Sequence, residues 1–286
     1  MFDTHAHVNF NAFKSDSPDV LKRAQEADIS IVNVGSQYST SERAVQIAQI
    51  YENVYAAIGL HPVHLEEMVI EEEGETFETR QAEFDFEAYF KLGQDEKVVA
   101  VGETGLDFHH IPANIDQNKA IEKQKKIFHE HIRLANKLGK PVIIHCRGSK
   151  ENFDEAYRQI FEELKNDLPE KRGIMHCYGG PVDLVKEMTD LGFYISFNGI
   201  LTFDKTGKIE SILKETPLKK ILFETDCPYL TPKPFRGKRN EPSYVRHVLN
   251  KAALILKIES TELEKITDEN AKTLFQLQNK KDIESN

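Results

Sequence analysis

The sequence has few cysteines and no long apolar run. Its 286 residues include three cysteines, Cys146, Cys177 and Cys227, and this odd number argues against a disulfide framework. No apolar segment approaches the roughly 20 residues needed to cross a bilayer, and no apolar leader stands at the N-terminus. We therefore expect a cytoplasmic protein without a membrane partner, and the sequence indicates no obligate protein partner.

Positive charge is also in deficit. The chain has 37 Lys and Arg against 47 Asp and Glu, which gives a net charge of −10. This balance argues against a general polyanion-binding surface, so a nucleic-acid substrate would need local basic groups or metal ions to offset the repulsion. Much of the excess acid lies in residues 66–83, which we expect to be a solvated excursion, partly helical at most.

Short apolar segments alternate with amphipathic ones along the chain. The apolar segments are rich in Val and Ile without polar alternation, which is typical of strands buried on both faces. We predict strands at 2–4, 30–34, 54–59, 98–102, 141–144, 173–175, 193–197 and 220–223. We predict helices at 18–27, 40–51, 84–92, 117–138, 150–164, 181–191, 207–214, 241–258 and 261–278.

Eight strand-then-helix units predict one domain of the α/β class over residues 1–286. The expected fold is a TIM-like (β/α)8 barrel with an extra C-terminal helix. An open doubly wound sheet is the alternative. Possible ligands after strands that are spread along the chain favour closure, because the strand ends of a closed barrel meet on one face.

Histidine and carboxylate side chains stand where these strands end. Six such groups are too many for one closed zinc site, which takes four ligands. They suit two divalent ions, with magnesium, manganese and zinc all compatible. The candidate metal ligands are His5, His7, Glu103, His145, His176 and Asp226.

The carboxylates among these ligands have predicted catalytic roles. Glu103 is the expected bridge, because a carboxylate can give one oxygen to each ion. Asp226 is expected to bind one ion together with His5 and His7, and also to accept a proton from the attacking water. Glu224 faces the same side as Asp226. Two roles suit Glu224 equally well. It could orient a metal ligand, or it could form a charge pair inside the barrel.

Other residues are candidates for contact with the substrate. His61 follows the third strand and should reach the mouth of the site. The segment after Asp226 holds four cations within seven residues, and its prolines predict a shaped loop. Its guanidinium groups can hold phosphate and its aromatic rings can stack on bases. The predicted contacts from this basic segment are Tyr229, Arg236, Lys238 and Arg239.

The remaining histidines and the cysteines are expected to be structural or at the surface. His129 and His131 lie two residues apart in a helix and diverge, and neither His64 nor His247 has a supporting context. His109 and His110 follow Glu103 on a loop, where a place at the entrance of the barrel and a simple loop position are both compatible, the second at least as much as the first. Each cysteine directly follows a proposed ligand, so strand alternation turns it outward, as a small buried packing residue.

These motifs together resemble the TatD family of metal-dependent deoxyribonucleases. The matching segments are Asp3-Thr4-His5-Ala6-His7, Gly59-Leu60-His61-Pro62, Gly102-Glu103-Thr104-Gly105-Leu106-Asp107, His145-Cys146-Arg147, His176-Cys177-Tyr178-Gly179-Gly180, Glu224-Thr225-Asp226-Cys227-Pro228, Arg236-Gly237-Lys238-Arg239-Asn240-Glu241-Pro242 and Glu269-Asn270-Ala271. The resemblance implies a TIM-like barrel with two ions on the six ligands, and 3′-to-5′ removal of nucleotides from DNA. The acidic insertion 66–83 and the pair His109-His110 depart from the family pattern.

Two other functions remain open from the sequence. A metal-dependent hydrolase of a small amide, lactone or ester could use the same barrel and ligands. A non-catalytic nucleic-acid-binding module would not need a complete ligand set, and the acidic balance argues against it. The leading prediction is a divalent-metal-dependent phosphodiester hydrolase that acts on DNA.

Overall fold

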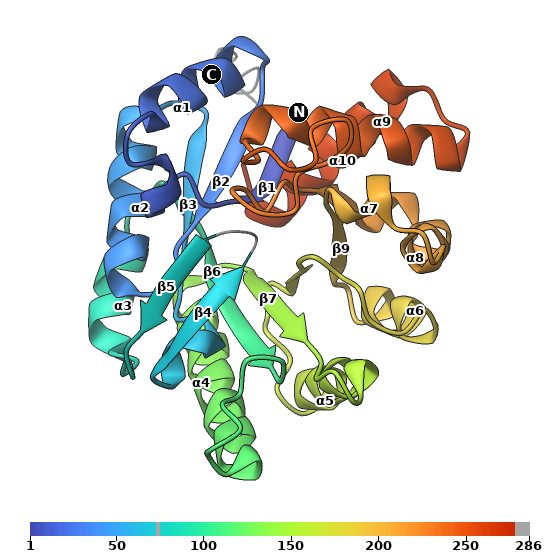
Figure 1. The fold of residues 1–286 in the computed structure, drawn as a ribbon. Coiled ribbons are helices and arrows are strands. Elements are labelled where there is room, and N and C mark those ends of the chain that lie inside the picture. Colours follow the sequence, from blue (N-terminus) through green and yellow to red (C-terminus); the bar gives the residue numbers. More distant parts are fainter. Residues whose placement is uncertain (73–74, 278–286) are drawn as a thin grey trace.

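Parallel strands form one curved sheet that nearly closes into a barrel (Figure 1). The computed structural model describes residues 1–72 and 75–277. The eight strands follow the order β1-β2-β3-β6-β7-β8-β9-β10, and the predicted TIM-like barrel is confirmed. The strands are β1 (Phe2–Ala6), β2 (Ser30–Val34), β3 (Val54–Ile58), β6 (Val98–Asp107), β7 (Val142–Arg147), β8 (Gly173–Met175), β9 (Tyr194–Phe197) and β10 (Ile221–Phe223).

Helices surround the barrel and bury their apolar stripes against it. The longest, α4, begins after Asp116, whose side chain accepts the Lys119 N–H, and ends at Gly139 with φ +65°. No helix among the described residues is long and apolar enough to cross a membrane. The helices are α1 (Ser17–Glu26), α2 (Tyr38–Ile50), α3 (Phe86–Gly93), α4 (Gln117–Leu138), α5 (Phe153–Asn166), α6 (Asp183–Asp190), α7 (Ile200–Phe203), α8 (Lys208–Glu215), α9 (Val245–Leu256) and α10 (Ser260–Phe275).

The first and last strands meet through the segments that follow them. The Asp226 N–H donates to the His5 carbonyl at 2.8 Å, and the His7 N–H donates to the Cys227 carbonyl at 2.9 Å. The Thr4 hydroxyl donates to the Phe223 carbonyl at 3.0 Å. Two parts of the chain more than 200 residues apart are thereby held side by side at one end of the barrel.

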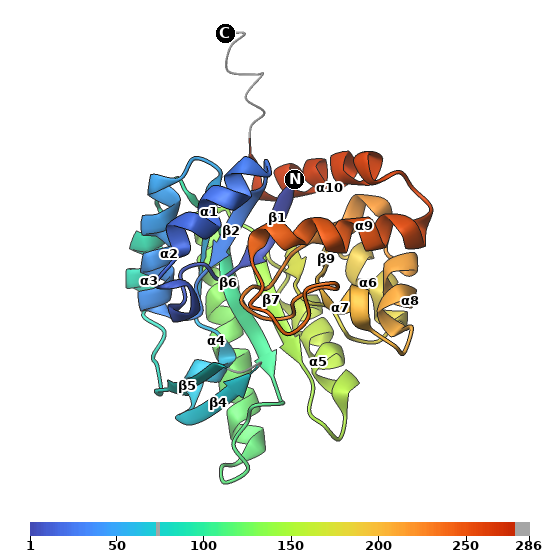
Figure 2. The same cartoon turned by 45° about the horizontal axis from the view of Figure 1, so that its top comes forward.

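The extra C-terminal helix covers the opposite end of the barrel. In α10, Ala271, Leu274 and Phe275 join the apolar residues of the barrel interior, among them Phe2 and Leu222. Figure 2 shows α10 at one end of the molecule and the strands β4 and β5 at the other. The barrel therefore has an apolar floor, and its polar side chains lie toward the other end.

Asn270 ties this floor to the barrel. Its amide donates to the Leu218 and Ile221 carbonyls, both at 2.8 Å. We expect Asn270→Ala to lower the free energy of unfolding by about 2 kcal/mol, because buried carbonyls lose their donors. Urea denaturation measures the change. The control is Asn166→Ala, which removes an exposed amide at the end of α5. An equal effect of the two substitutions would contradict the role given to Asn270.

Three sequence-based expectations about local structure were wrong. The acidic stretch 66–83 is not a partly helical excursion, because it contains the antiparallel strands β4 (Met68–Glu72) and β5 (Glu75–Thr79). Strands β6 and β7 continue through Glu103 and His145 instead of stopping before them. The short helix α7 was not predicted. The predicted helix end at residue 278 lies outside the described residues.

Candidate metal centre

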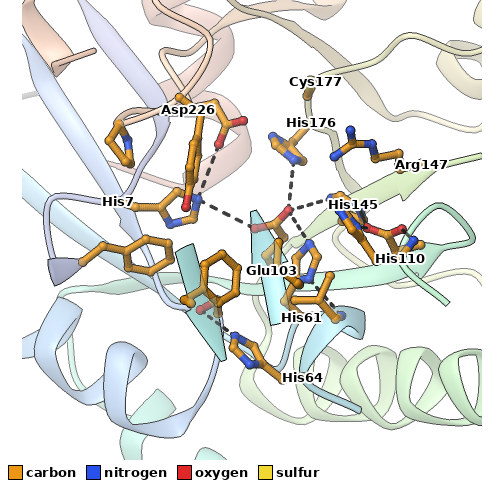
Figure 3. Close-up of a pocket in the computed structure, with 18 of the residues that line it drawn as sticks. His7, His61, His64, Glu103, His110, His145, Arg147, His176, Cys177 and Asp226 are labelled. Carbon is orange, nitrogen blue, oxygen red and sulfur yellow. Dashed lines mark hydrogen bonds and ion pairs between the residues drawn. The ribbon is translucent and has the colours of Figure 1, made fainter. Parts of the chain in front are cut away.

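Glu103 is the centre of a cluster of imidazoles (Figure 3). Its Oε1 lies 2.9 Å from His145 Nδ1, 3.0 Å from His176 Nε2 and 3.3 Å from His61 Nε2. Its Oε2 lies 3.4 Å from His5 Nε2 and 3.9 Å from His7 Nε2. The two oxygens of one buried carboxylate thus face two different groups of histidines, as a bridging ligand would require.

Close backbone packing of β6 puts Glu103 in this position. Gly102 has φ +148° and Gly105 has φ +143°, values that L side chains rarely adopt. A Cβ on Gly102 would overlap Ile143, and a Cβ on Gly105 would overlap the His145 carbonyl oxygen. The two glycines therefore let β6 pack directly on β7, which carries His145.

His5 and His7 point their Nε2 atoms at the same place. Their Nε2 atoms are 3.1 Å apart. His7 Nδ1 lies 2.8 Å from the Val34 carbonyl, which can only accept, so His7 carries its proton on Nδ1 and turns the Nε2 lone pair inward. Ligand nitrogens lie about 2.0–2.1 Å from a bound zinc, so a separation near 3 Å suits two ligands of one ion.

Carboxylates hold the rings of His145 and His176 from behind. His145 Nε2 lies 3.1 Å from Asp107 Oδ2, and His176 Nδ1 lies 3.2 Å from Glu224 Oε1. Each ring therefore turns one nitrogen toward Glu103 and the other toward a fully buried acid. Carboxylates in this position orient metal-binding histidines and make them more basic.

His61 differs from these histidines in its tautomer. Its Nδ1 accepts the Val63 backbone N–H at 3.1 Å, so the neutral ring carries its proton on Nε2. That Nε2–H faces Glu103 and the cavity. His61 is therefore arranged to donate a hydrogen bond rather than a lone pair, as its predicted contact with a substrate would require.

Charge and burial oppose each other throughout the cluster. Burial alone raises the pKa of Glu103, but nearby His61, His176 and His5 outweigh it and hold the pKa well below its usual value. Burial lowers the pKa of His145, while hydrogen bonds to Asp107 and Glu103 raise it to about 9. The cluster thus keeps its carboxylates ionised and attracts positive charge. A metal ion at His145 would have to displace a proton.

The donor set fits divalent cations. His5 Nδ1 and Glu224 Oε2 are buried polar atoms with no hydrogen-bond partner among the described residues. Four groups of three ligand atoms lie within 4.8 Å of one another among the described residues, and two of them share Glu103. One of these two is formed by His5, His7 and Glu103, and the other by Glu103, His145 and His176. Mixed imidazole and carboxylate ligands of this kind suit zinc and manganese.

Asp226 stands beside the first of these groups and closer to solvent. Its Oδ1 lies 3.4 Å from His7 Nε2 and 3.8 Å from His5 Nε2. Its side chain is 15% exposed, against 6% for Glu103. All six ligands predicted from the sequence therefore come together, and Asp226 is the carboxylate among them that faces the open side.

A cavity of about 610 Å³ leads from this cluster to the surface. Tyr229 and His61 line it, as do Arg43 and Arg147, which sequence reasoning did not propose as substrate contacts. The cations of the basic segment do not border it: Arg239 forms an ion pair with Asp16 at 2.5 Å, and the Arg236 guanidinium lies 4.2 Å from the centre of the Phe203 ring. The substrate contacts assigned to Arg236, Lys238 and Arg239 stay predictions.

One further expectation changes at the cavity wall, and one position becomes defined. Cys177 was expected to turn outward, but it borders the cavity and is only half-buried. Strand alternation does not extend to it, because β8 ends at Met175 and Cys177 has φ +46°. Burial raises its pKa to about 12, so the thiol stays protonated. His64, which had no supporting context in the sequence, is buried at the wall and lies 3.2 Å from the Ser36 hydroxyl.

Asp107 is the acid that sequence reasoning did not assign to the site. It is buried, and Oδ2 contacts both His145 and His110. The signal was available, since Asp107 lies four residues after Glu103 on one extended strand and therefore on the same face. The predicted end of the strand at residue 102 hid this relation.

We expect Asp107→Asn to weaken metal binding about 10- to 100-fold, because His145 loses the carboxylate that orients it. Titration calorimetry with Mn²⁺ and with Zn²⁺ on metal-stripped protein measures the change. His110→Phe is the matched control, since it removes the other partner of Asp107 and leaves the contact with His145 in place. Wild-type affinity in Asp107→Asn would show that Asp107 does not position His145.

A barrel of parallel strands with imidazoles and carboxylates gathered at its open end defines a metal-dependent hydrolase. The family model described as TatD related DNase matches residues 2–276, and the chain belongs to this family. It is 39% identical to the uncharacterized metal-dependent hydrolase YabD of Bacillus subtilis, over 97% of this chain and 99% of that protein.

Two further relatives agree with this assignment. The chain is 29% identical to the 3′-5′ ssDNA/RNA exonuclease TatD of Klebsiella pneumoniae, over 96% of this chain and 97% of that protein. The crystal structure of YjjV, a TatD homologue of Escherichia coli, matches with a TM-score of 0.79 and 25% identity, over 97% of this chain and 98% of that one.

Proposed function

We propose that the chain is a divalent-metal-dependent phosphodiesterase that removes nucleotides from the 3′ end of DNA. The observation that carries this proposal is the convergence of the ligand set on Glu103 at the inner end of the cavity. Arg43 and Arg147 at the wall favour an anionic substrate. The relative named a 3′-5′ ssDNA/RNA exonuclease supports the choice of substrate.

The residues present would hold two divalent ions, and Glu103 would be a ligand shared by both. His5, His7 and Asp226 would hold one ion, and His145 and His176 would hold the other. Bound ions of this kind lower the pKa of water and offset charge on phosphoryl oxygens. Asp107 and Glu224 fix the two histidine rings of the second group, and the Val34 carbonyl fixes His7.

Asp226 and His61 have different roles in this proposal. Asp226 accepts the proton of the attacking water, because its carboxylate is ionised and is more exposed than that of Glu103. Burial raises its pKa, but His7, His176 and His5 outweigh this and lower it. His61 donates its Nε2–H to the substrate phosphate. Arg147 offsets phosphate charge at the cavity wall.

Removal of the metal ions tests the proposal. We expect dialysis against a chelator to lower the rate on a 5′-labelled single-stranded oligonucleotide by at least about 100-fold, because water loses its activation. Addition of Mn²⁺, Mg²⁺ or Zn²⁺ should restore the rate. An undiminished rate of oligonucleotide cleavage in protein that elemental analysis shows to be metal-free would contradict the proposal. Cleavage of small esters or lactones alone, with no oligonucleotide cleavage, would favour the alternative substrate class.

A further inference from the structure

The acidic hairpin formed by β4 and β5 is a wall of the cavity. Ile70, Thr76 and Phe77 line the same space as His61 and Glu103. Figure 1 places the two strands beside β6 and β7, at the open end of the barrel. The hairpin lies within the acidic segment 66–83, so this segment contributes directly to the cavity.

One face of the hairpin is apolar and turned toward the cavity. Ile70 and Phe77 are directly paired across the two strands, so their side chains share a face. Ile70 is 3% exposed, whereas Val69, on the other face, is 62% exposed. The Phe77 ring lies 6.4 Å from the ring of His64, which is itself buried at the cavity wall. Phe77 therefore offers an aromatic surface beside the metal-binding cluster.

The base of the hairpin is fixed to the barrel. The Thr79 hydroxyl donates to the Glu66 carbonyl at 2.7 Å and accepts the Met68 N–H at 3.0 Å. Glu66 forms an ion pair with Lys123 of α4 at 2.9 Å. The Ala82 N–H donates to the His64 carbonyl at 2.8 Å. These contacts hold the apolar face of the hairpin in place from both ends of the segment.

The charge of the hairpin opposes a polyanion. Residues 66–79 contain seven glutamates and no lysine, arginine or histidine. A nucleic-acid backbone that continued past the cluster on this side would meet like charge. A nucleobase is uncharged and has an apolar face, so it can occupy the space beside Phe77 without this cost.

We propose that the hairpin binds the base of the last nucleotide of a single strand and blocks the backbone from continuing past it. The proposal rests on the proposed phosphodiesterase function and adds the element that restricts cleavage to strand ends. Phe77 and Ile70 supply the surface for the terminal base, and the net negative charge of residues 66–79 opposes the interior of a strand. Other aromatic residues, Phe10 and Tyr229, lie elsewhere on the cavity wall. The Phe10 ring is stacked on His7, with the ring centres 4.2 Å apart.

Linear and circular single-stranded DNA of one sequence separate the two parts of this proposal. We expect wild-type protein with Mn²⁺ to degrade the linear strand and leave the circle intact. Phe77→Ala should raise KM for the linear strand about tenfold, since stacking on one aromatic ring is lost. Phe77→Tyr should restore it. Replacement of residues 68–79 by a short Gly-Ser linker should allow cleavage of the circle.

Val69→Ala is the matched control, because it shortens an apolar side chain on the outer face of the same strand. The substitution of Glu67, Glu71, Glu72, Glu73, Glu75 and Glu78 by glutamine tests the charge of the segment, and it keeps Glu66, which anchors the hairpin to Lys123. This variant should also permit cleavage of the circle. Wild-type cleavage of the circle at the linear rate, or an unchanged preference in all of these folded variants, would overturn the proposal. Wild-type protein that cleaves neither DNA with any metal would instead refute the proposed function.

Discussion

Glu103→Gln should lower kcat on a single-stranded oligonucleotide by about 10⁴-fold, because the substitution removes the charge shared by both groups of histidines. Glutamine has nearly the same volume as glutamate, but it presents one oxygen and an amide. The NH₂ group would face imidazole nitrogens that now lie within 3.9 Å of a carboxylate oxygen. The variant should also hold fewer metal ions, which elemental analysis of the protein measures directly.

Glu162→Gln is the control for this substitution. Glu162 forms an ion pair with nearby Lys165 on the surface of α5, and its side chain is 60% exposed. Its replacement should leave kcat and metal content unchanged, because an exposed ion pair contributes at most about 1 kcal/mol to stability. Full metal content together with wild-type kcat in Glu103→Gln would show that neither ion depends on the proposed bridge.

Asp226→Asn should lower kcat by about 10³-fold, since asparagine cannot accept the proton of the attacking water. Asp226 adopts φ +56°, a conformation that asparagine also tolerates. The Asp226 N–H would still donate to the His5 carbonyl, so the closure of the barrel is kept. Rates under saturating Mn²⁺ separate the loss of a proton acceptor from weaker metal binding.

The control for Asp226→Asn is Asp190→Asn at the end of α6. Asp190 forms an exposed pair with Lys186, four residues earlier in the same helix. We expect its replacement to leave kcat unchanged. If Asp226→Asn kept the wild-type kcat under saturating metal, proton transfer would have to be assigned to another group, and His61 would be tested next.

The sequence predicted the positions of the ligands better than the ends of the strands. On β7 and β8 an apolar residue inside the barrel stands two positions before a ligand, as in Ile143 before His145 and Ile174 before His176. This spacing brings each ligand to the open end once the barrel closes. The pattern could not show that β6 runs on through Glu103 to Asp107, because Gly102 and Gly105 normally indicate that a strand has ended.

Local sequence patterns could not predict contacts between segments that are distant in the chain. The four cations after Asp226 predicted a phosphate-binding loop, yet Arg239 meets Asp16, which lies 223 residues away in the chain. The Glu-rich hairpin was missed because its acidic charge indicated a solvated segment and glutamate is depleted in strands. The hairpin is held instead by contacts that the local pattern does not show, such as those of the Thr79 hydroxyl with Glu66 and Met68 and the ion pair between Glu66 and Lys123.

The apolar side chains that α10 packs against the barrel close one of its ends. Among the described residues, the interior below the ligands is filled by side chains such as Phe2, Leu222 and Phe275. Under the proposed function, ions, water and nucleotides would enter through the cavity that the hairpin and Tyr229 line. A nucleotide in the cavity would then stand between the ions and the solvent. We therefore expect protein kept saturated with substrate to lose its ions to a chelator more slowly than protein without substrate.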